Sequence, residues 1–362
     1  MKDIKGTGET STGFKSGQMV IKPQFDNVSD FSEGLASVKI RDAKTEHWGF
    51  IDKTGKMVIN PQFDFAYGFS EGLAAVRIGD EKSGKWGFIN KNGKMVINPQ
   101  FDEAGNFSEG LAAVGIGNYE TGKLGFIDKA GRMIINPQYS YNIRPSYTKF
   151  TEGLASVKIK DSNREKWGFI DKRGRIVINP QFDNAGWFNE GLARVNIQDS
   201  HTEKWGFIDK TGKIVIKLRF EDNSDFSEGL AGVRIGDDKT GKWGFINKNG
   251  KMVIKPQFDF AGGWGFSEGL AAVRIGDDKT GKWGFIDKTG QMVINPQYSN
   301  GGLMFLVRFR EGLAPVSVGK YGFIDKTGNM VINPQFDDIS ARGFSEGLAP
   351  VRIGWKWGVI SK

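Results

Sequence analysis

One short motif recurs nine times along the 362 residues of this chain and constrains its fold more than any other feature. The motif reads Phe-x-Glu-Gly-Leu-Ala, and successive copies lie 38, 38, 43, 38, 38, 40, 43 and 35 residues apart. Its phenylalanines are Phe31, Phe69, Phe107, Phe150, Phe188, Phe226, Phe266, Phe309 and Phe344. A near-constant period of this size is typical of repeat architectures. We therefore interpret residues 17–362 as a single array of nine units, preceded by a flexible segment, 1–16.

Two further patterns accompany each copy. An aromatic-Gly-Phe-Ile core begins at Trp48, Trp86, Trp167, Trp205, Trp243, Trp283 and Trp357, with Leu124 and Tyr321 in the other two units. An Ile-Asn-Pro-Gln-Phe segment, as at 59–63, follows with small changes. A residue present in every unit is better explained by packing that is common to all units than by nine identical active sites. We interpret the tryptophans, and pairs such as Glu71-Gly72 and Glu109-Gly110, as structural.

Each unit is predicted to form strands. In 73–101, strands are expected at 73–78, 86–89 and 95–97, joined by a hairpin loop at 79–85 and a tight turn at 90–93. Pro99 is expected to end the third strand because it has no N–H for the ladder. A short fourth strand would fit within 101–107. The fold class is therefore all-β, with three or four antiparallel strands in each unit.

Both faces of each small sheet are apolar. Trp86 and Phe88 share one face, and Ile89 lies on the other. Neighbouring units should therefore cover each sheet on both sides, because a single unit of this size is not stable alone. The array either closes into a propeller-like ring or remains an open superhelix. Residues 17–21 match the third strand and 357–360 match the second, so their pairing would seal a ring.

Composition excludes several classes of function. The chain has no Cys, which removes disulfides, thiolate metal sites and a Cys nucleophile. No apolar run is long enough for a transmembrane helix, and the first residues show no signal peptide. A place outside the cytoplasm would therefore need an export signal beyond this chain, and the sequence leaves the location unknown.

The block Trp-Gly-Phe-Ile-(Asp/Asn)-Lys-x-Gly-x-(Met/Ile)-Val-Ile-x-Pro-Gln-Phe resembles the bacterial WG-repeat family, including its KWG variants. The resemblance covers residues 17–362, with departures at Leu124, Tyr321 and Leu218-Arg219. It implies a β-rich, non-enzymatic binding module and carries no shared reaction.

Two series of charged residues are as regular as the motif. The Glu of each motif either binds cations or accepts backbone N–H bonds beside its Gly, and we favour the second interpretation. A Lys in each tight turn, such as Lys91, forms a ladder that a polyanion could contact, given a net charge of +8. The alternative is a solvated turn. No nucleic-acid-binding module is recognisable, so nucleic acid is an unlikely partner.

Metal and catalytic chemistry have little support in the sequence. Asp237-Asp238 and Asp277-Asp278 begin hairpin loops that lack the spacing and closing Glu of calcium loops. His47 and His201 fall at different offsets and do not form a ligand pair. No metal or cofactor is predicted, and the chain is not expected to be an enzyme.

Irregular positions point to a recognition site. Two spacers are five residues longer than the 38-residue norm, at 139–149 and 298–308. Exposed aromatic residues on rigid arrays suit binding of protein or sugar. The candidate binding residues are Tyr139, Tyr141, Arg144, Tyr147, Trp187, Trp264, Tyr298, Met304, Phe305 and Arg308. The alternative is that both spacers tuck inward and fill gaps.

The sequence predicts a non-catalytic repeat scaffold that binds another macromolecule, either a protein or a polysaccharide. The alternatives are a polyanion-binding surface, a self-assembling surface component, and a glycan hydrolase using one carboxylate pair. Shortening 140–144 and 299–303 to the norm should then keep the fold and abolish partner capture.

Overall fold

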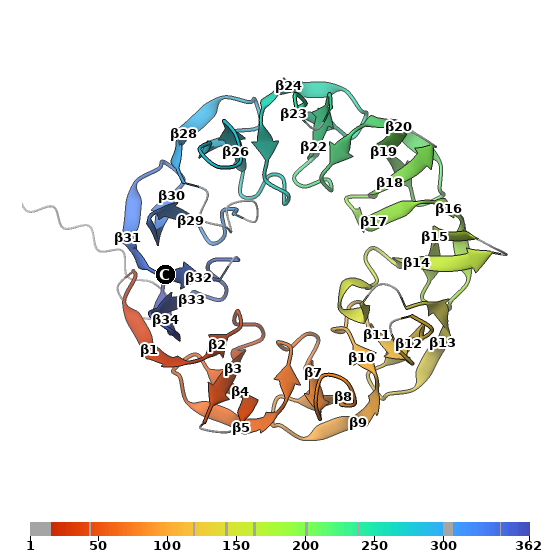
Figure 1. The fold of residues 1–362 in the computed structure, drawn as a ribbon, viewed down its shortest axis with the longest axis vertical. Coiled ribbons are helices and arrows are strands. Elements are labelled where there is room, and N and C mark those ends of the chain that lie inside the picture. The colour runs from red at the N-terminus through yellow and green to blue at the C-terminus, as the bar shows by residue number, and fades with distance from the viewer. Residues whose placement is uncertain are drawn as a thin grey trace, which may run out of the picture.

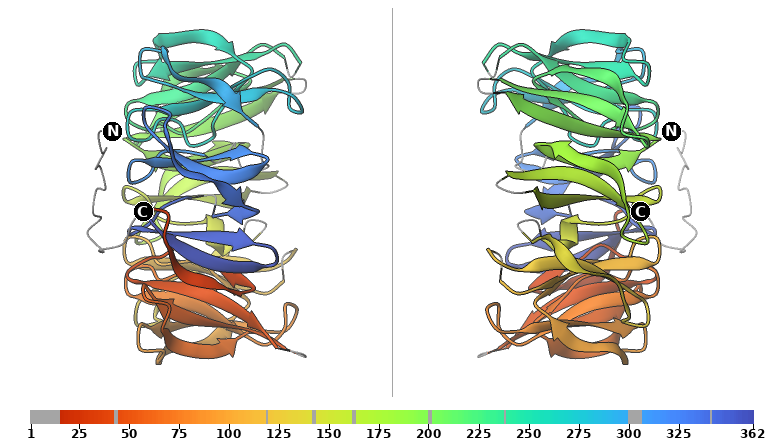
Figure 2. Two further views of the ribbon diagram at one scale, coloured as in Figure 1. Left: turned by 90° about the vertical axis from the view of Figure 1, so that its left-hand side faces the viewer. Right: turned by 90° about the vertical axis from the view of Figure 1, so that its right-hand side faces the viewer.

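The computed structural model describes residues 16–362 except 43–44, 119, 142–143, 162–163, 200–201, 238, 300–306 and 341. Nine small antiparallel sheets are arranged as the blades of a closed propeller around an open centre (Figure 1). Seen from the side, the ring is a disc with the blades set side by side (Figure 2). Of the segment expected to be flexible, 1–16, only Ser16 is described.

Strands are named by their place in a blade, from the centre outward. The inner strands are β2 (Asn27–Val28), β6 (Phe65–Ala66), β10 (Glu103–Ala104), β17 (Asn184–Asn189), β21 (Asp222–Asn223), β25 (Phe260–Ala261) and β32 (Asp338–Ile339). The second strands are β3 (Leu35–Arg41), β7 (Leu73–Ile78), β11 (Leu111–Ile116), β14 (Leu154–Asp161), β18 (Leu192–Asp199), β22 (Leu230–Ile235), β26 (Ala271–Ile275), β29 (Leu313–Val318) and β33 (Leu348–Ile353).

The third strands are β4 (Glu46–Asp52), β8 (Lys85–Asn90), β12 (Lys123–Asp128), β15 (Arg164–Asp171), β19 (Thr202–Asp209), β23 (Lys242–Asn247), β27 (Lys282–Ile286), β30 (Lys320–Asp325) and β34 (Lys356–Ser361). The outer strands are β5 (Met57–Phe63), β9 (Met95–Phe101), β13 (Met133–Ser140), β16 (Ile176–Phe182), β20 (Ile214–Phe220), β24 (Met252–Phe258), β28 (Met292–Tyr298), β31 (Met330–Phe336) and β1 (Met19–Phe25). One 3-10 helix, η1 (Pro145–Tyr147), lies in the first long spacer.

Blades are numbered 1 to 9 from the sheet β2-β3-β4-β5 to the sheet β32-β33-β34-β1. In the described part of the chain, seven sheets have four strands, and blades 4 and 8 have three. The predicted short strand in 101–107 is confirmed as β10. The two blades for which no inner strand is described are the ones whose spacers are five residues longer.

The two ends of the strands define two faces of the disc. We call the side with the Glu-Gly loops and the tight turns, such as 90–93, the turn face. The opposite side carries the loops between second and third strands, such as 79–84, and is called the hairpin face. Each outer strand ends at the hairpin face, and in the seven blades with a described inner strand a single residue separates that strand from the outer strand before it.

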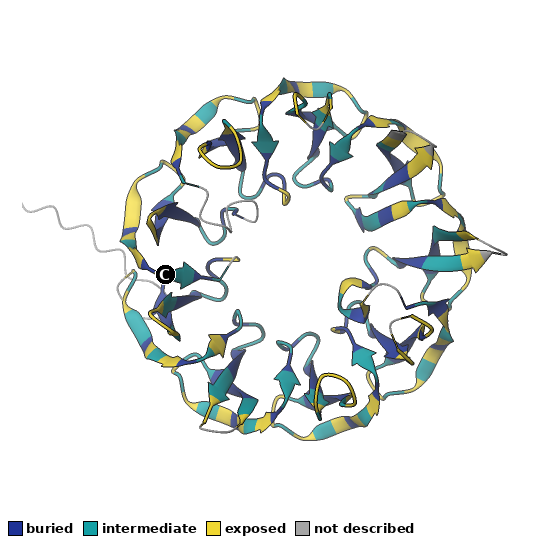
Figure 3. Cartoon of the chain, viewed as in Figure 1, coloured by how far each residue is buried: buried dark blue, intermediate teal, exposed yellow. Residues whose placement is uncertain are grey.

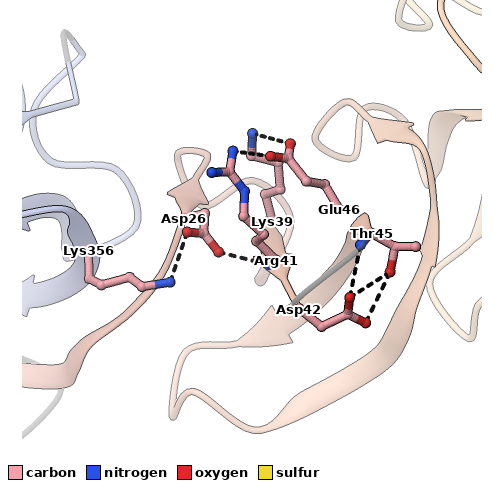
Figure 4. A network of polar contacts seen from close by, with 7 residues as sticks. All are labelled: Asp26, Lys39, Arg41, Asp42, Thr45, Glu46 and Lys356. Carbon is pink, nitrogen blue, oxygen red and sulfur yellow. Dashed lines mark hydrogen bonds and ion pairs between the residues drawn. The ribbon is translucent and has the colours of Figure 1, made fainter.

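The ring closes by pairing the two ends of the chain. Strand β1 lies antiparallel to β34, with Ile21 opposite Val359 and Phe25 opposite Trp357. Figure 4 shows Asp26 at this junction, between Lys356 and Arg41. The Lys356 ammonium donates to Asp26 over 2.8 Å, and the Arg41 backbone N–H donates to the same carboxylate over 2.8 Å. Of the two alternatives that the sequence left open, the nine-unit ring sealed by its two ends is the one that forms.

The hydrophobic core lies between the blades. One buried cluster joins Trp86, Phe88 and Ile97 of blade 2 to Phe107 and Val114 of blade 3. The opposite face of blade 2, which carries Ile89, packs against blade 1. Buried segments follow the blade interfaces around the whole ring (Figure 3). The predicted assignment of side chains to two covered faces is therefore confirmed.

The prediction that Pro99 ends its strand is wrong. Strand β9 runs through Pro99 to Phe101, and its pairing with β8 is irregular between Phe88↔Ile97 and Trp86↔Phe101. Pro99 lies within this bulge on an outer strand, where no ladder hydrogen bond needs its missing N–H. The bulge brings the outer backbone close to Gly87, where an added Cβ would lie 2.4 Å from the Ile97 carbonyl oxygen. The Gly of the Trp-Gly pair is therefore required by close approach of two strands.

The tryptophans of the repeat pack as the structural interpretation requires. Trp48, Trp86, Trp205, Trp243 and Trp283 are buried, and Trp283 is only 1% exposed. Trp167 and Trp357 are partly buried and pack against the clusters at their own blade interfaces.

The motif Glu residues form a belt on the turn face, in which each carboxylate binds the next blade. Glu33 of blade 1 accepts the Gly72 backbone N–H at 3.0 Å and pairs with Lys91 at 3.1 Å, both from blade 2. Equivalent bonds join Glu71 to Gly110 and Glu109 to Gly153. The prediction that Glu serves backbone N–H groups is confirmed, with the difference that the Gly belongs to the neighbouring blade.

The belt explains two other features of the repeat. All nine Glu residues have a left-handed backbone, with φ between 50 and 56°. Few residues other than Gly or Asn adopt this conformation readily, but only a longer carboxylate reaches the next blade. Eight turn lysines pair with these carboxylates over 2.9–3.1 Å. The lysine ladder is thus neutralised by glutamates, which weakens it as a polyanion surface.

The belt should make stability depend on acidic pH. Burial raises the pKa of Glu152, but hydrogen bonds from Lys210 and Gly191 outweigh it, so the net pKa lies below its ordinary value of 4.5. A lowered folded pKa gives stability that is present above pH 4.5 and is lost as pH falls through the folded value. Glu152→Gln should therefore lower the unfolding free energy at pH 7 by at most about 1 kcal/mol, because the pair is partly exposed.

The measurement is guanidinium unfolding of both proteins at pH 7, 5 and 3. At pH 3 the difference between wild type and Glu152→Gln should disappear, since the wild-type carboxylate is then protonated as well. A difference of the same size at all three pH values would contradict the proposed role of the charge.

Candidate functional site

A second belt, on the hairpin face, marks where the insertions enter. At five positions the Asp that follows an outer strand accepts a Lys from its own blade and a backbone N–H from the next one. Asp102 does so with Lys85 at 2.5 Å and Gly117 at 2.8 Å. In the two units with long spacers this Asp is replaced by Ser140 or Ser299. Ser140 instead donates to Glu165 of blade 4, and Ser299 accepts from Lys282 of its own blade, so the carboxylate bonds of this belt are missing at the start of each insertion.

The insertion after Ser140 crosses blade 3. The Tyr141 ring lies against Gly115 of β11, where an added Cβ would be 2.2 Å from the Tyr141 Cε2 atom. The Tyr141 hydroxyl donates to Glu103 of β10 over 2.7 Å. Gly105 makes room for η1 in the same way, because a Cβ there would lie 2.3 Å from the Pro145 carbonyl oxygen. Two glycines of blade 3 thus accommodate a segment that belongs to blade 4.

The crossing encloses a cavity of about 1100 Å³ between blades 2 and 3, open to the hairpin face. It is lined by Phe65, Tyr67, Arg77, Glu81, Lys82, Gly84, Trp86, Asp102, Glu103, Gly117, Asn118, Tyr141, Arg144 and Tyr147. Blade 2 supplies its aromatic wall, blade 3 supplies a polar wall, and the insertion supplies the third side.

The aromatic wall is a set of rings in mutual contact. Tyr67 stacks on Trp86 with ring centroids 5.2 Å apart and an angle of 18° between planes. Phe65 meets Tyr67 edge-on at 5.1 Å. The Arg77 guanidinium lies 5.9 Å from the Phe65 centroid and 6.0 Å from the Trp86 centroid. The buried Arg77 Nε has no hydrogen-bond partner among the described residues, so a donor remains beside the cavity.

The polar wall holds its groups in defined protonation states. Burial opposes ionisation of Asp102, but hydrogen bonds from Lys85 and Gly117 prevail and lower its pKa. Burial, and then the bond to Glu103, raise the pKa of Tyr141, so its hydroxyl stays protonated and donates. Burial also raises the pKa of Tyr67, and a Ser146 hydrogen bond partly offsets this rise. At neutral pH the cavity therefore presents the neutral phenols of Tyr141 and Tyr67 and the ionised carboxylate of Asp102.

The structure divides the predicted binding residues into three groups. Tyr141, Arg144 and Tyr147 line the cavity, with Tyr147 64% exposed. Tyr139 and Tyr298 are at most 5% exposed and fill the core between blades, so they are unavailable to a partner.

The remaining residues of the prediction lie elsewhere. Trp187 and Trp264 each carry a basic side chain over the ring: Lys149 at 4.1 Å and Arg308 at 4.7 Å from the centroids. Met304 and Phe305 fall outside the described residues. The alternative that the spacers tuck inward holds for Tyr139 and Tyr298 but not for Tyr147.

Sequence reasoning missed the residues of blades 2 and 3 that complete the cavity. Tyr67 is an aromatic residue at a position held by Ser29, Gly105 or Ser224 in other units. Gly115 occupies a position that elsewhere carries a larger polar side chain such as Arg77. These two departures from the repeat pattern are the sequence signals that could have indicated the cavity.

The described residues lack two further features. They contain no group of three or more His, Asp or Glu side chains arranged to hold a metal ion. They also contain no helix long and apolar enough to span a membrane.

Several solved structures are similar to parts of this chain. The β-propeller domain of the Trilobed protease from Pyrococcus furiosus is 10% identical with a TM-score of 0.41, covering 75% of this chain and 95% of that one. TolB from Acinetobacter baumannii is 9% identical with a TM-score of 0.33, covering 73% and 77%. A prolyl endopeptidase is 8% identical with a TM-score of 0.44, and the match covers 77% of this chain and 50% of the endopeptidase. Comparison with curated protein sequences gives no significant match.

The family comparison matches the chain from end to end. The model for the WG containing repeat fits residues 15–42, 48–81, 86–119, 125–162, 167–199, 205–239, 243–279, 283–320 and 321–357. These segments correspond to the nine units read from the sequence, and each contributes strands to two adjacent blades. The chain therefore belongs to the WG containing repeat family, and its nine repeats form a nine-bladed propeller.

Proposed function

We propose that this propeller is a non-catalytic binding protein that holds a polysaccharide in the cavity between blades 2 and 3. The observation that carries the proposal is the aromatic wall of Tyr67 and Phe65, backed by the buried Trp86, which faces polar groups across a space bounded by an insertion. Sugars present apolar C–H faces that pack on aromatic rings and hydroxyl groups that need donors and acceptors.

The size and chemistry of the cavity support a polysaccharide. About 1100 Å³ exceeds the space that a single small ligand usually needs, which leaves room for more than one sugar ring. Arg77 and Asn118 offer donors, and Glu103 offers acceptors, on different walls. A hydrolase would require a protonated carboxylic acid, whereas Asp102 has a lowered pKa and its carboxylate is already bound by Lys85.

Tyr147→Ala should weaken glycan binding about tenfold, equivalent to about 1.4 kcal/mol, because it removes an exposed ring from the cavity. Binding is measured by affinity electrophoresis in gels that contain neutral, acidic or amino polysaccharides. Trp355→Ala is the matched control: Trp355 is 88% exposed and lies outside the cavity lining. A deletion of 140–144 should remove binding altogether, because Tyr141 anchors the insertion on blade 3.

Three outcomes would contradict the proposal. If none of the polysaccharides slows the migration of the protein, polysaccharide is excluded as the ligand class. Equal losses from Tyr147→Ala and Trp355→Ala would exclude the site. Release of reducing ends from a retarding polysaccharide would exclude a purely binding role.

A further inference from the structure

Arg77 lies beside the cavity between blades 2 and 3 without an anionic partner from the chain. Its guanidinium lies 5.9 Å from the Phe65 ring centroid and 6.0 Å from the Trp86 centroid, so the two rings help to hold it in place. Among the described residues, Arg77 forms no ion pair, and its buried Nε has no hydrogen-bond partner. A guanidinium stays charged in proteins and carries several N–H donors. Arg77 therefore presents its charge and its donors to the cavity.

The equivalent residues of other blades are paired with carboxylates. Arg77 lies on the second strand of blade 2, opposite Trp86. Four basic residues at this position form ion pairs: Lys39 with Glu46 at 2.8 Å, Lys158 with Glu165 at 3.6 Å, Arg274 with Asp278 at 2.5 Å, and Arg352 with Asp338 at 3.3 Å. Glu81 follows Arg77 by four residues, as Asp278 follows Arg274, but within the described part of the chain it forms no pair with Arg77. Blade 2 thus leaves unpaired a charge that these four blades neutralise.

Most of the carboxylates that line the cavity are already bound within the chain. Lys85 pairs with Asp102 at 2.5 Å, and the Tyr141 hydroxyl donates to Glu103 over 2.7 Å. Glu81, the third carboxylate of the lining, is exposed in the hairpin loop. The lining itself holds as many basic residues as carboxylates, and Lys85 cancels Asp102 from outside it. The cavity therefore has an excess of positive charge.

We propose that the polysaccharide held in this cavity is an acidic one, with a uronic-acid carboxylate paired to Arg77 and its sugar ring packed on Phe65 and Tyr67. The inference rests on the proposed function and names the class of sugar. A guanidinium and a carboxylate are both planar and form two parallel charge-assisted hydrogen bonds. In a uronic acid the carboxylate is attached directly to the sugar ring. A cation that lies over Phe65 is therefore well placed to meet it when the ring packs on the aromatic wall.

The test is calorimetric titration of uronic-acid oligomers into the full chain at physiological ionic strength. The probes are oligomers of galacturonate, glucuronate and mannuronate, each compared with the same oligomer after its carboxyl groups have been reduced to alcohols. Reduction removes the charge and leaves the ring and its linkage unchanged. Wild type should bind at least one acidic oligomer, and at least about tenfold more tightly than its reduced form.

Arg77→Gln removes the charge and keeps an amide donor beside the aromatic wall. It should bind the acidic oligomer at least about tenfold more weakly than wild type does, and its affinity for the reduced oligomer should change little. The control is Lys94→Gln, which removes the same charge from an exposed residue of blade 2 outside the cavity lining. It should keep the wild-type affinity for both oligomers.

Equal binding of acidic and reduced oligomers by wild type would overturn this inference and leave the polysaccharide proposal in place. Equal losses for both oligomers in Arg77→Gln would also overturn it, because Arg77 would then support the aromatic wall without binding a charge. So would equal losses in Arg77→Gln and Lys94→Gln, because binding would then follow net charge. Binding of neither oligomer in any pair would contradict the inference together with the polysaccharide proposal.

Discussion

Gly87→Ala should destabilise the propeller by about 3 kcal/mol, although it adds a single methyl group. The added Cβ would lie 2.4 Å from the Ile97 carbonyl oxygen and 2.8 Å from the Pro99 nitrogen. Both atoms belong to the backbone of β9, so no side chain can rotate away. The outer strand would have to move, and its bonds to β8 and its packing on blade 3 would weaken together.

Gly68→Ala is the matched control in the same blade. An added Cβ at Gly68 meets no atom within 4 Å, and the residue is not among those with positive φ. Its effect on the unfolding free energy should stay within about 0.5 kcal/mol. Guanidinium unfolding followed by tryptophan fluorescence compares the two variants. Equal losses would show that the close approach of β8 and β9 is not what requires glycine.

The same glycine shows which parts of the fold can be predicted from the sequence and which cannot. The recurrence of Gly87 and its equivalents was plain, and the strands at 73–78 and 86–89 were placed nearly as they occur. The reason for the glycine was hidden because it depends on the register between two strands. A bulge that carries Pro99 within β9 leaves no local signature, so the strand was expected to end at that residue.

The functional regions show the same limit. Residue counts alone located both insertions, and aromatic content alone marked Tyr141 and Tyr147. Where an insertion goes depends on contacts with other units, and the first one crosses blade 3 because Gly105 and Gly115 leave room for it. Closure of the array into a ring could not be predicted from the sequence either, because it depends on a small rotation between successive units that accumulates over the whole ring. Only the complementary ends, residues 17–21 and 357–360, pointed to it.

Ile21→Asp should open the ring. Ile21 is 3% exposed and packs in the cluster that joins blade 9 to blade 1. A Cβ added at Gly55 would lie 3.0 Å from Ile21 Cγ1, so the side chain also touches the tight turn of blade 1. Burying a carboxylate here without a partner should cost about 4 kcal/mol. Lys22→Asp is the control, since Lys22 is the next residue on the same strand and is exposed.

Ile21→Asp should change the shape of the molecule, whereas the equivalent substitution in another blade should only lower its stability. Ile97 occupies the equivalent place in blade 2, and it is also 3% exposed. Ile97→Asp should lower stability by a similar amount, but β9 is continuous with β8 and β10 along the chain and stays attached. Strand β1 is joined to β34 only by hydrogen bonds and packing, so its release leaves blade 9 and blade 1 linked mainly by the Glu346 bonds to Gly34 and Lys53. Small-angle X-ray scattering should therefore show a larger radius of gyration for Ile21→Asp than for Ile97→Asp or Lys22→Asp under folding conditions. Equal radii for all three would mean that the other eight blade interfaces hold the ring shut without the closing strand.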